Sequence, residues 1–155
     1  MKIYLVQHAV AKSEDEDPNR PLTEAGILDA EKIGAFIGQM DLNLEGIFYS
    51  EKLRAKQTAL IMSKYLKTEF GCHETDTLCA NDDIQVWIMR CLCADGNPML
   101  VGHMPHLNKM LSRLVSGDEE KQVLNFHNAG VVCIEGDEET EDFNVKWVIL
   151  PEMLT

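Results

Sequence analysis

The chain has 155 residues, 45% of them hydrophobic, which is enough for one domain over residues 1–155 with a buried core. Its formal net charge of −12 excludes a surface that attracts a nucleic-acid backbone or an anionic membrane. No apolar run approaches the roughly 20 residues that cross a bilayer, and no signal-peptide pattern precedes the first strand. We therefore expect a soluble, cytoplasmic protein.

Strands and helices alternate along the first half of the chain. Apolar residues at helical spacing, with Thr23 as a candidate N-cap, predict a helix after the first strand. The predicted elements are a strand over 2–7, a helix over 24–40, a strand over 45–49, a helix over 52–66 and a weak strand within 73–79. Such an order is typical of a parallel sheet with crossover helices.

The second half continues the alternation and ends differently. Its predicted elements are a helix from Asp82 or Asp83 to about Cys93, a strand over 99–101, a helix over 106–115, and two strands over 123–134 and 143–150. An acidic turn over 136–142 joins the last two strands into a hairpin. The sequence therefore predicts an α/β fold, a three-layer α/β/α sandwich with a mostly parallel central sheet and an antiparallel edge.

The five cysteines are expected to be free thiols buried in the core. Their number is odd, they form no Cys-x-x-Cys pair, and a chain of this length needs no disulfide to fold. A metal cluster of Cys72, His73 and Cys79 is the alternative, but their spacing matches no common zinc pattern. We therefore expect neither a metal nor another cofactor.

Acidic runs fall in predicted loops and turns, at 14–17, 118–120 and 137–142. A solvated surface is the simplest interpretation of such runs. The run at 14–17 precedes the first predicted helix and lies near the candidate site described next, so it could instead screen binding partners.

Polar residues follow the predicted strands where each one ends. His8 follows the first strand, Ser50 and Arg54 follow the second, and His103 follows the strand over 99–101. Arg20 lies in the loop after the first strand. Because ligands of open parallel sheets bind at the carboxyl ends of the strands, we expect these side chains to gather at one edge.

Two arginines and nearby helix N-termini would make an anion site, since guanidinium groups match phosphate bidentately. Neutral imidazole is a competent nucleophile near pH 7, so His8 could accept a phosphoryl group. His103 would then hydrogen-bond the phosphoryl oxygens as a cation. Each residue taken singly has a structural interpretation. A metal pair of His103 and His106 is disfavoured because Pro105 opposes helix just before it.

Four segments carry a family resemblance. They are Leu5–Ala9, Arg20–Gly26, Tyr49–Thr58 and Leu100–His103, the last followed by Pro105 and His106. With these segments in this order, the chain resembles the histidine phosphatase superfamily, and within it the SixA-type protein-histidine phosphatases. The resemblance implies a phosphoglycerate mutase-like fold and a phosphatase of phosphohistidine in signal transduction.

The resemblance also implies residue roles. His8 matches the histidine that is transiently phosphorylated, and His103 matches the second catalytic histidine. Arg20 and Arg54 match phosphate-binding residues. The superfamily motif is Arg-His-Gly, so Gln7 stands where an arginine is expected; its amide can still donate to phosphate. Ala9 stands where a glycine is expected, which matters only if the backbone there needs a positive φ.

Gln7 leaves two functional hypotheses open. The first is a phosphatase that removes phosphate from phosphohistidine on a signalling or phosphocarrier protein, or from a small phosphate ester, through phospho-His8. The second is a weakened or inactive member of the same fold that binds phosphate or a phosphoprotein without turnover. The sequence favours the enzyme, because one missing donor rarely removes all transition-state stabilisation.

Overall fold

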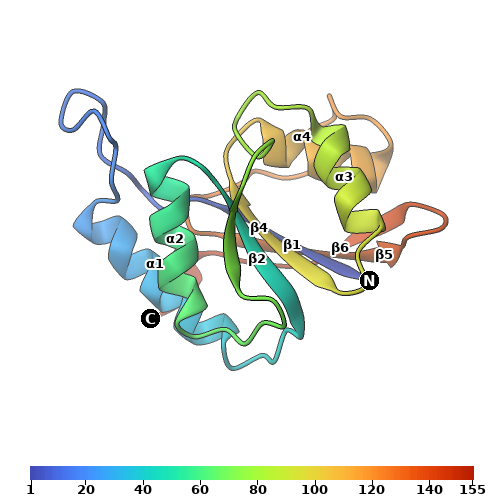
Figure 1. The fold of residues 1–155 in the computed structure, drawn as a ribbon, viewed down its shortest axis with the longest axis horizontal. Helices are drawn as coiled ribbons and strands as arrows, with labels where there is room; N and C mark the ends of the chain where they lie inside the picture. Colours follow the sequence, from blue (N-terminus) through green and yellow to red (C-terminus); the bar gives the residue numbers. More distant parts are fainter.

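The computed structural model describes residues 1–155 and places six strands in one sheet, in the order β3-β2-β4-β1-β5-β6 (Figure 1). The strands are β1 (Lys2–Gln7), β2 (Leu44–Ser50), β3 (Cys72–Thr75), β4 (Asn97–Gly102), β5 (Val131–Asp137) and β6 (Asp142–Ile149). β3, β2, β4 and β1 are mutually parallel. Beyond β1, β5 runs antiparallel to β1, and β6 runs antiparallel to β5. The predicted sheet with an antiparallel edge is confirmed.

Helices cover both faces of this sheet (Figure 1). They are α1 (Glu24–Ile37), α2 (Leu53–Ser63), α3 (Ile84–Leu92), α4 (His106–Ser116) and the short 3-10 helix η1 (Pro151–Met153). The side-chain alternation of β1 shows the layers: Tyr4 and Val6 pack in a cluster with α1 and α2, whereas Ile3 and Leu5 pack in a second cluster with α3 and α4. The three-layer sandwich is therefore also confirmed.

The register of the sheet brings three strand ends to one level. Gln7 of β1 pairs with Gly102 of β4, and Tyr49 of β2 pairs with Val101 of β4. The backbone N–H of His8 extends this ladder by donating to the carbonyl oxygen of Gly102 at 3.1 Å. The residues that follow the three strands are therefore neighbours, as expected at the carboxyl edge of a parallel sheet.

Side-chain caps start two of the helices as predicted. Thr23 Oγ1 accepts the N–H of Gly26 at the start of α1, and Asp83 Oδ1 accepts the N–H of Gln85 at the start of α3. Such caps satisfy backbone donors that have no partner inside the helix. No helix of the protein is both long and apolar enough to cross a membrane.

The chain differs from prediction in the segment before β5. A strand was expected from residue 123, but β5 begins at Val131. Ala129 has a positive φ of 63°, and its N–H donates to the carbonyl oxygen of Gln7 at 3.0 Å, so a turn packs onto the end of β1 here. An extended strand cannot make that turn. The hairpin turn is also shorter than expected, because β5 reaches Asp137 and β6 starts at Asp142.

The expectation for the cysteines is only partly right. All five thiols are free, and Cys91 and Cys133 are buried. Cys72 and Cys79 are half-buried, however, and Cys93 is exposed. The prediction of a buried thiol is wrong for Cys93, which is the C-cap residue that follows the last turn of α3.

Gly26 provides a test of how the loop after β1 is held. A Cβ at this position would lie 2.1 Å from the carbonyl oxygen of Val10, and that oxygen accepts the N–H of Thr23 at 3.0 Å. We predict that Gly26→Ala lowers the free energy of unfolding by about 1–3 kcal/mol, because backbone must move to relieve the contact. Urea denaturation measures the change.

Helix propensity predicts the opposite sign for the same substitution. In an uncrowded helix, replacing glycine by alanine would stabilise the protein by roughly 0.5–1 kcal/mol. An unchanged or increased stability of Gly26→Ala would therefore show that Val10 and α1 do not approach each other as described.

Candidate active site

The proton on His8 is fixed by the neighbouring carbonyl group. His8 Nδ1 lies 2.7 Å from the carbonyl oxygen of Ala9, and because that oxygen can only accept, Nδ1 carries the proton. Nε2 is left with its lone pair. Burial lowers the pKa of His8 below its usual value; the bond to the Ala9 carbonyl partly offsets this, and the charges of Arg54 and Arg20 lower the pKa further. The ring is therefore a neutral base with a defined nucleophilic nitrogen.

The backbone around His8 is held from two sides. The N–H of Ala9 donates to Thr58 Oγ1 at 2.9 Å, and the Thr58 hydroxyl donates to the carbonyl oxygen of Arg54 at 2.8 Å. From the other side, Asn128 Nδ2 donates to the carbonyl oxygen of His8 at 2.9 Å. Ala9 is buried and its φ is negative, so alanine in place of the motif glycine causes no backbone strain.

His103 lies beside His8, with 5.1 Å between the ring centroids. Its Nε2 is hydrogen-bonded to Ser50 Oγ at 2.6 Å, and both side chains are buried. Burial, with the neighbouring titratable ring of His8 and the charge of Arg54, lowers the pKa of His103 to about 3. In the free protein His103 is therefore neutral at pH 7, whereas the expected cation concerns the state with a bound phosphoryl group and stays a prediction.

The neutral state of His103 still suits an anion. When the Ser50 hydroxyl donates to Nε2, the ring proton resides on Nδ1, which has no partner within the protein. A dianion bound beside Nδ1 would meet an N–H donor there, and its negative charge would raise the pKa of the ring. His103 can thus donate to a phosphoryl oxygen without being charged beforehand.

Arg20 and Arg54 line one pocket of about 460 Å³ with six further residues: Glu14, Pro18, Asn19, Glu51, Lys52 and Leu53. Neither arginine forms a salt bridge. Arg54 Nε is buried without a hydrogen-bond partner, and burial and the charge of Arg20 lower the pKa of Arg54. Two guanidinium groups without acidic partners favour the binding of an anion between them.

Arg20 is placed by the loop rather than by a helix or strand. Its backbone has a positive φ of 48°, and its N–H donates to the carbonyl oxygen of Asp17 at 3.0 Å. Its side-chain Nε donates to the carbonyl oxygen of Lys12, also at 3.0 Å. The loop is tied to α2 because the N–H of Leu22 donates to Gln57 Oε1 at 2.7 Å. The segment around Arg20 is therefore connected to the helix that carries Arg54.

Gln7 is next to the site in the chain but takes no part in its hydrogen bonds. Its Oε1 is buried without a partner, and its amide nitrogen makes no hydrogen bond within the protein. Alternation along β1 places its side chain on the same face as Ile3 and Leu5, toward α3 and α4. The structure thus brings together His8, His103, Arg20 and Arg54. The side chain of Gln7 forms no hydrogen bond with any of these four residues.

His106 is a buried residue whose ring nitrogens have no partner. Burial lowers its pKa, an effect that Asp82 and Asp83 partly offset. It starts α4, whereas His103 precedes the helix, so the two rings do not share a helical face. No group of three or more His, Cys, Asp and Glu side chains is arranged to hold a metal ion.

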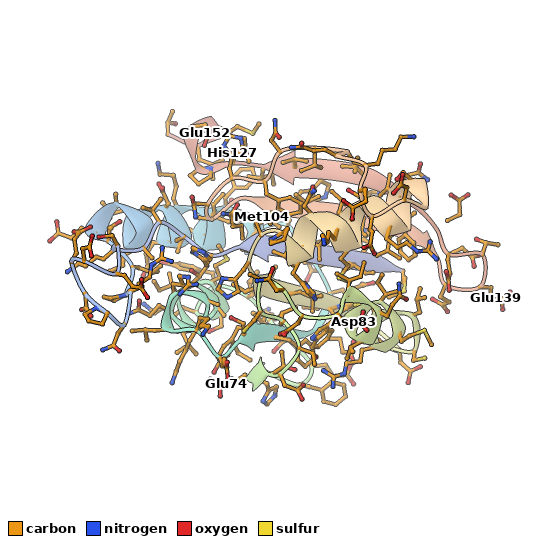
Figure 2. The ribbon with its side chains drawn as sticks, turned by 90° about the horizontal axis from the view of Figure 1, so that it is seen from above. Glu74, Asp83, Met104, His127, Glu139 and Glu152 are labelled. Atoms are coloured by element: carbon orange, nitrogen blue, oxygen red, sulfur yellow. The ribbon has the colours of Figure 1, made fainter.

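The acidic runs differ in their relation to the pocket. Glu14 lines the pocket with Glu51, so the first run does border the candidate site. The acidic turn of the β5–β6 hairpin lies elsewhere: Figure 2 shows Glu139 at one end of the molecule, well separated from Met104, which follows His103. The pocket therefore contains positive and negative side chains together.

Sequence reasoning did not assign several supporting residues. Ser50 was predicted at the correct strand end, but no role was predicted for it. Gln57 and Thr58 lie in one of the family motifs, but no role was predicted for them either. Asn128 and Ala129 were expected inside a strand. Their bonds to Gln7 and His8 join residues 120 or more positions apart along the chain, which no local pattern reveals.

Comparisons with known proteins agree with this fold. No protein-family model matches the chain. An uncharacterized protein of Picosynechococcus sp. is 30% identical over 141 residues, which cover 85% of this chain and 83% of that protein. Among solved structures, the protein histidine phosphatase SixA complexed with tungstate has a TM-score of 0.85 at 18% identity and covers 99% of both chains. A protein of Agrobacterium tumefaciens assigned as a phosphohistidine phosphatase SixA has a TM-score of 0.78 at 20% identity, over 97% of both chains.

These similarities are consistent along the whole chain. The sequence similarity extends over most of both proteins, and the structural similarity leaves almost no residue unmatched. The chain therefore belongs to the same family as the Picosynechococcus protein and has the phosphoglycerate mutase-like fold of the histidine phosphatase superfamily, which its sequence motifs resemble.

Proposed function

We propose that the protein is a phosphatase that transfers a phosphoryl group to His8 and then to water. One observation carries the proposal: the bond from His8 Nδ1 to the Ala9 carbonyl leaves Nε2 free as a nucleophile, within electrostatic reach of Arg20 and Arg54, two arginines that form no salt bridge. The fold match to a SixA phosphatase complexed with tungstate, a tetrahedral oxyanion like phosphate, supports the proposal.

The reaction has two displacements at phosphorus. In the first, the Nε2 lone pair of His8 attacks phosphorus, the bond to the leaving group breaks, and the leaving group takes up a proton from water. In the second, water attacks phospho-His8, the P–N bond breaks, and inorganic phosphate leaves while His8 returns to its neutral form. Arg20, Arg54 and His103 hold the phosphoryl oxygens in both steps, so catalysis rests on positioning and charge.

We propose phosphohistidine on a signalling or phosphocarrier protein as the substrate. Its imidazole leaves readily once protonated, so it needs little help from a protein acid. Asp83 Oδ1 caps α3, and Asp82 Oδ2 accepts the N–H of Cys79 at 2.8 Å, so both carboxylates have a structural role and neither is assigned as that acid. An unhindered phosphate ester remains the second substrate class for the same pocket.

Gln7 favours a second candidate function, the binding of phosphate or a phosphoprotein without turnover. It places an uncharged amide where the superfamily motif has a fixed positive charge, and the amide makes no hydrogen bond within the protein. Loss of one donor to a developing anion reduces a rate by roughly 10²–10³-fold. The remaining arginines can still hold the anion, which is why hydrolysis stays the preferred function.

Replacing His8 tests the nucleophile. We predict that His8→Ala lowers kcat/KM for a phosphohistidine protein or an aryl phosphate by at least about 10³-fold, because the accepting nitrogen is lost. His73→Ala, at an exposed histidine on edge strand β3, is the matched control and should retain activity. Turnover by His8→Ala at the rate of the parent protein would exclude the proposed mechanism.

The pH dependence of the parent protein tests the state of His8. Only neutral His8 attacks, and its pKa lies below the ordinary 6.5, so activity should persist as the pH falls through 6.5 and decline only at lower pH. The profile of kcat/KM, corrected for ionisation of the substrate, measures this. A half-maximal rate at or above pH 6.5 would contradict a depressed pKa.

Replacing Gln7 by arginine distinguishes the two candidate functions. We predict that Gln7→Arg raises kcat/KM roughly 10- to 100-fold, less than the full effect of a charged donor because glutamine already offers an N–H. Gln39→Arg, just beyond α1, adds the same charge away from the site and should change the rate less than about twofold.

The outcome depends on the parent protein as well as on the variant. If the parent binds phosphate without turnover and Gln7→Arg hydrolyses it, the binding function is correct for the natural chain. If Gln7→Arg leaves both rate and phosphate affinity unchanged, position 7 does not limit the site.

A further inference from the structure

The candidate pocket holds a third positive side chain. Lys52 lines it together with Arg20 and Arg54, and Glu14 and Glu51 line it as well. Three positive and two negative side chains therefore line this pocket. Without Lys52, the two arginines and the two glutamates that line the pocket would sum to zero charge. With Lys52 the pocket lining is net positive, in a protein whose formal net charge is −12.

The backbone of Lys52 is connected to the second histidine. Its N–H donates to Ser50 Oγ at 3.4 Å, and the same oxygen is hydrogen-bonded to His103 Nε2 at 2.6 Å. Lys52 is also the N-cap of α2, with an extended backbone and no side-chain cap bond. Its Cα is thus held where the positive end of the helix dipole meets the pocket.

The ammonium group of Lys52 is free to bind an anion. Lys52 forms no salt bridge, although Glu51 precedes it, and its side chain is exposed. The charge of Lys52 contributes to lowering the pKa of His103, which places the ammonium within electrostatic reach of that ring. A lysine on a flexible stem can approach a phosphoryl oxygen as a point charge.

We propose that Lys52 binds the phosphoryl group and supplies the positive charge that the superfamily motif places at position 7. The inference rests on the proposed function, because it concerns the same pocket. It assigns to Lys52 a binding role that compensates in part for Gln7: the charge comes from the start of α2 instead of from the end of β1.

A double-mutant cycle on tungstate binding tests the proposal. Isothermal titration calorimetry compares the parent protein, Lys52→Gln, Gln7→Arg and the double variant. Lys56→Gln, one turn further along α2 and outside the pocket, is the control of equal charge. We expect Lys52→Gln to weaken tungstate binding roughly three- to tenfold, the range for an exposed charge-assisted contact, and Lys56→Gln to change it less than about twofold.

The second arm of the cycle separates compensation from a general charge effect. If Lys52 replaces the missing arginine, the effect of Lys52→Gln should shrink to less than about twofold in the Gln7→Arg background, since the charge is then restored. Equal affinities of Lys52→Gln and Lys56→Gln would overturn the proposal, as would a full loss that persists in the Gln7→Arg background.

The measurement also keeps this inference apart from the proposed function. Binding that depends on Lys52 in a protein without turnover would support the inference and refute the phosphatase. Turnover through His8, together with tungstate binding that does not depend on Lys52, would support the phosphatase and refute the inference. A parent protein that does not bind tungstate would overturn both. Because Lys52 is exposed, thermal unfolding should show that Lys52→Gln is folded.

Discussion

The hydrogen bond from His8 Nδ1 to the carbonyl oxygen of Ala9 is the interaction on which the site depends. It decides which ring nitrogen keeps a lone pair and which way that nitrogen faces. A rotated ring or the other tautomer would leave the pocket without a nucleophile. The bond in turn requires a fixed Ala9, and the buried N–H of Ala9 is held by Thr58, which α2 provides. The fold therefore determines the chemistry of the histidine through the backbone of its neighbour.

Charge is the second constraint. A protein of net charge −12 repels phosphate at long range, so attraction must come from a few groups close to the anion. Arg20 and Arg54 supply it without acidic partners, and each lowers the pKa of His8. The same charges that hold the anion thus help to keep the nucleophile neutral. Lys52 fits this arrangement, because it adds a positive charge to the pocket, and its backbone is joined to His103 through Ser50, without occupying the position of Gln7.

The sequence predicted the sheet and the meeting of the strand ends because both follow from local patterns. Apolar runs and helical stripes identify β1, β2, β4 and the helices, and parallel strands place His8, Ser50 and His103 at one edge. The family motifs contained Gln57 and Thr58, but only the structure explains them as bonds to the backbone of Leu22 and Ala9.

Other features depend on burial or on contacts between distant segments, which a sequence pattern does not contain. The turn at Ala129 is folded by its bond to the end of β1, so its residues were expected in a strand. The neutrality of His103 follows from its burial beside other positive groups. The role of Lys52 needs the pocket, since a lysine before a helix is otherwise unremarkable in a sequence.

A crystal structure of the protein with orthovanadate tests the central claim most directly, because vanadate bonds to a nucleophile placed for phosphoryl transfer. The account predicts vanadium bonded to Nε2 of His8, with Nδ1 still directed at the Ala9 carbonyl and the vanadate oxygens contacted by Arg20, Arg54 and His103. Vanadate bound elsewhere, or His8 turned so that Nδ1 faces the pocket, would contradict it.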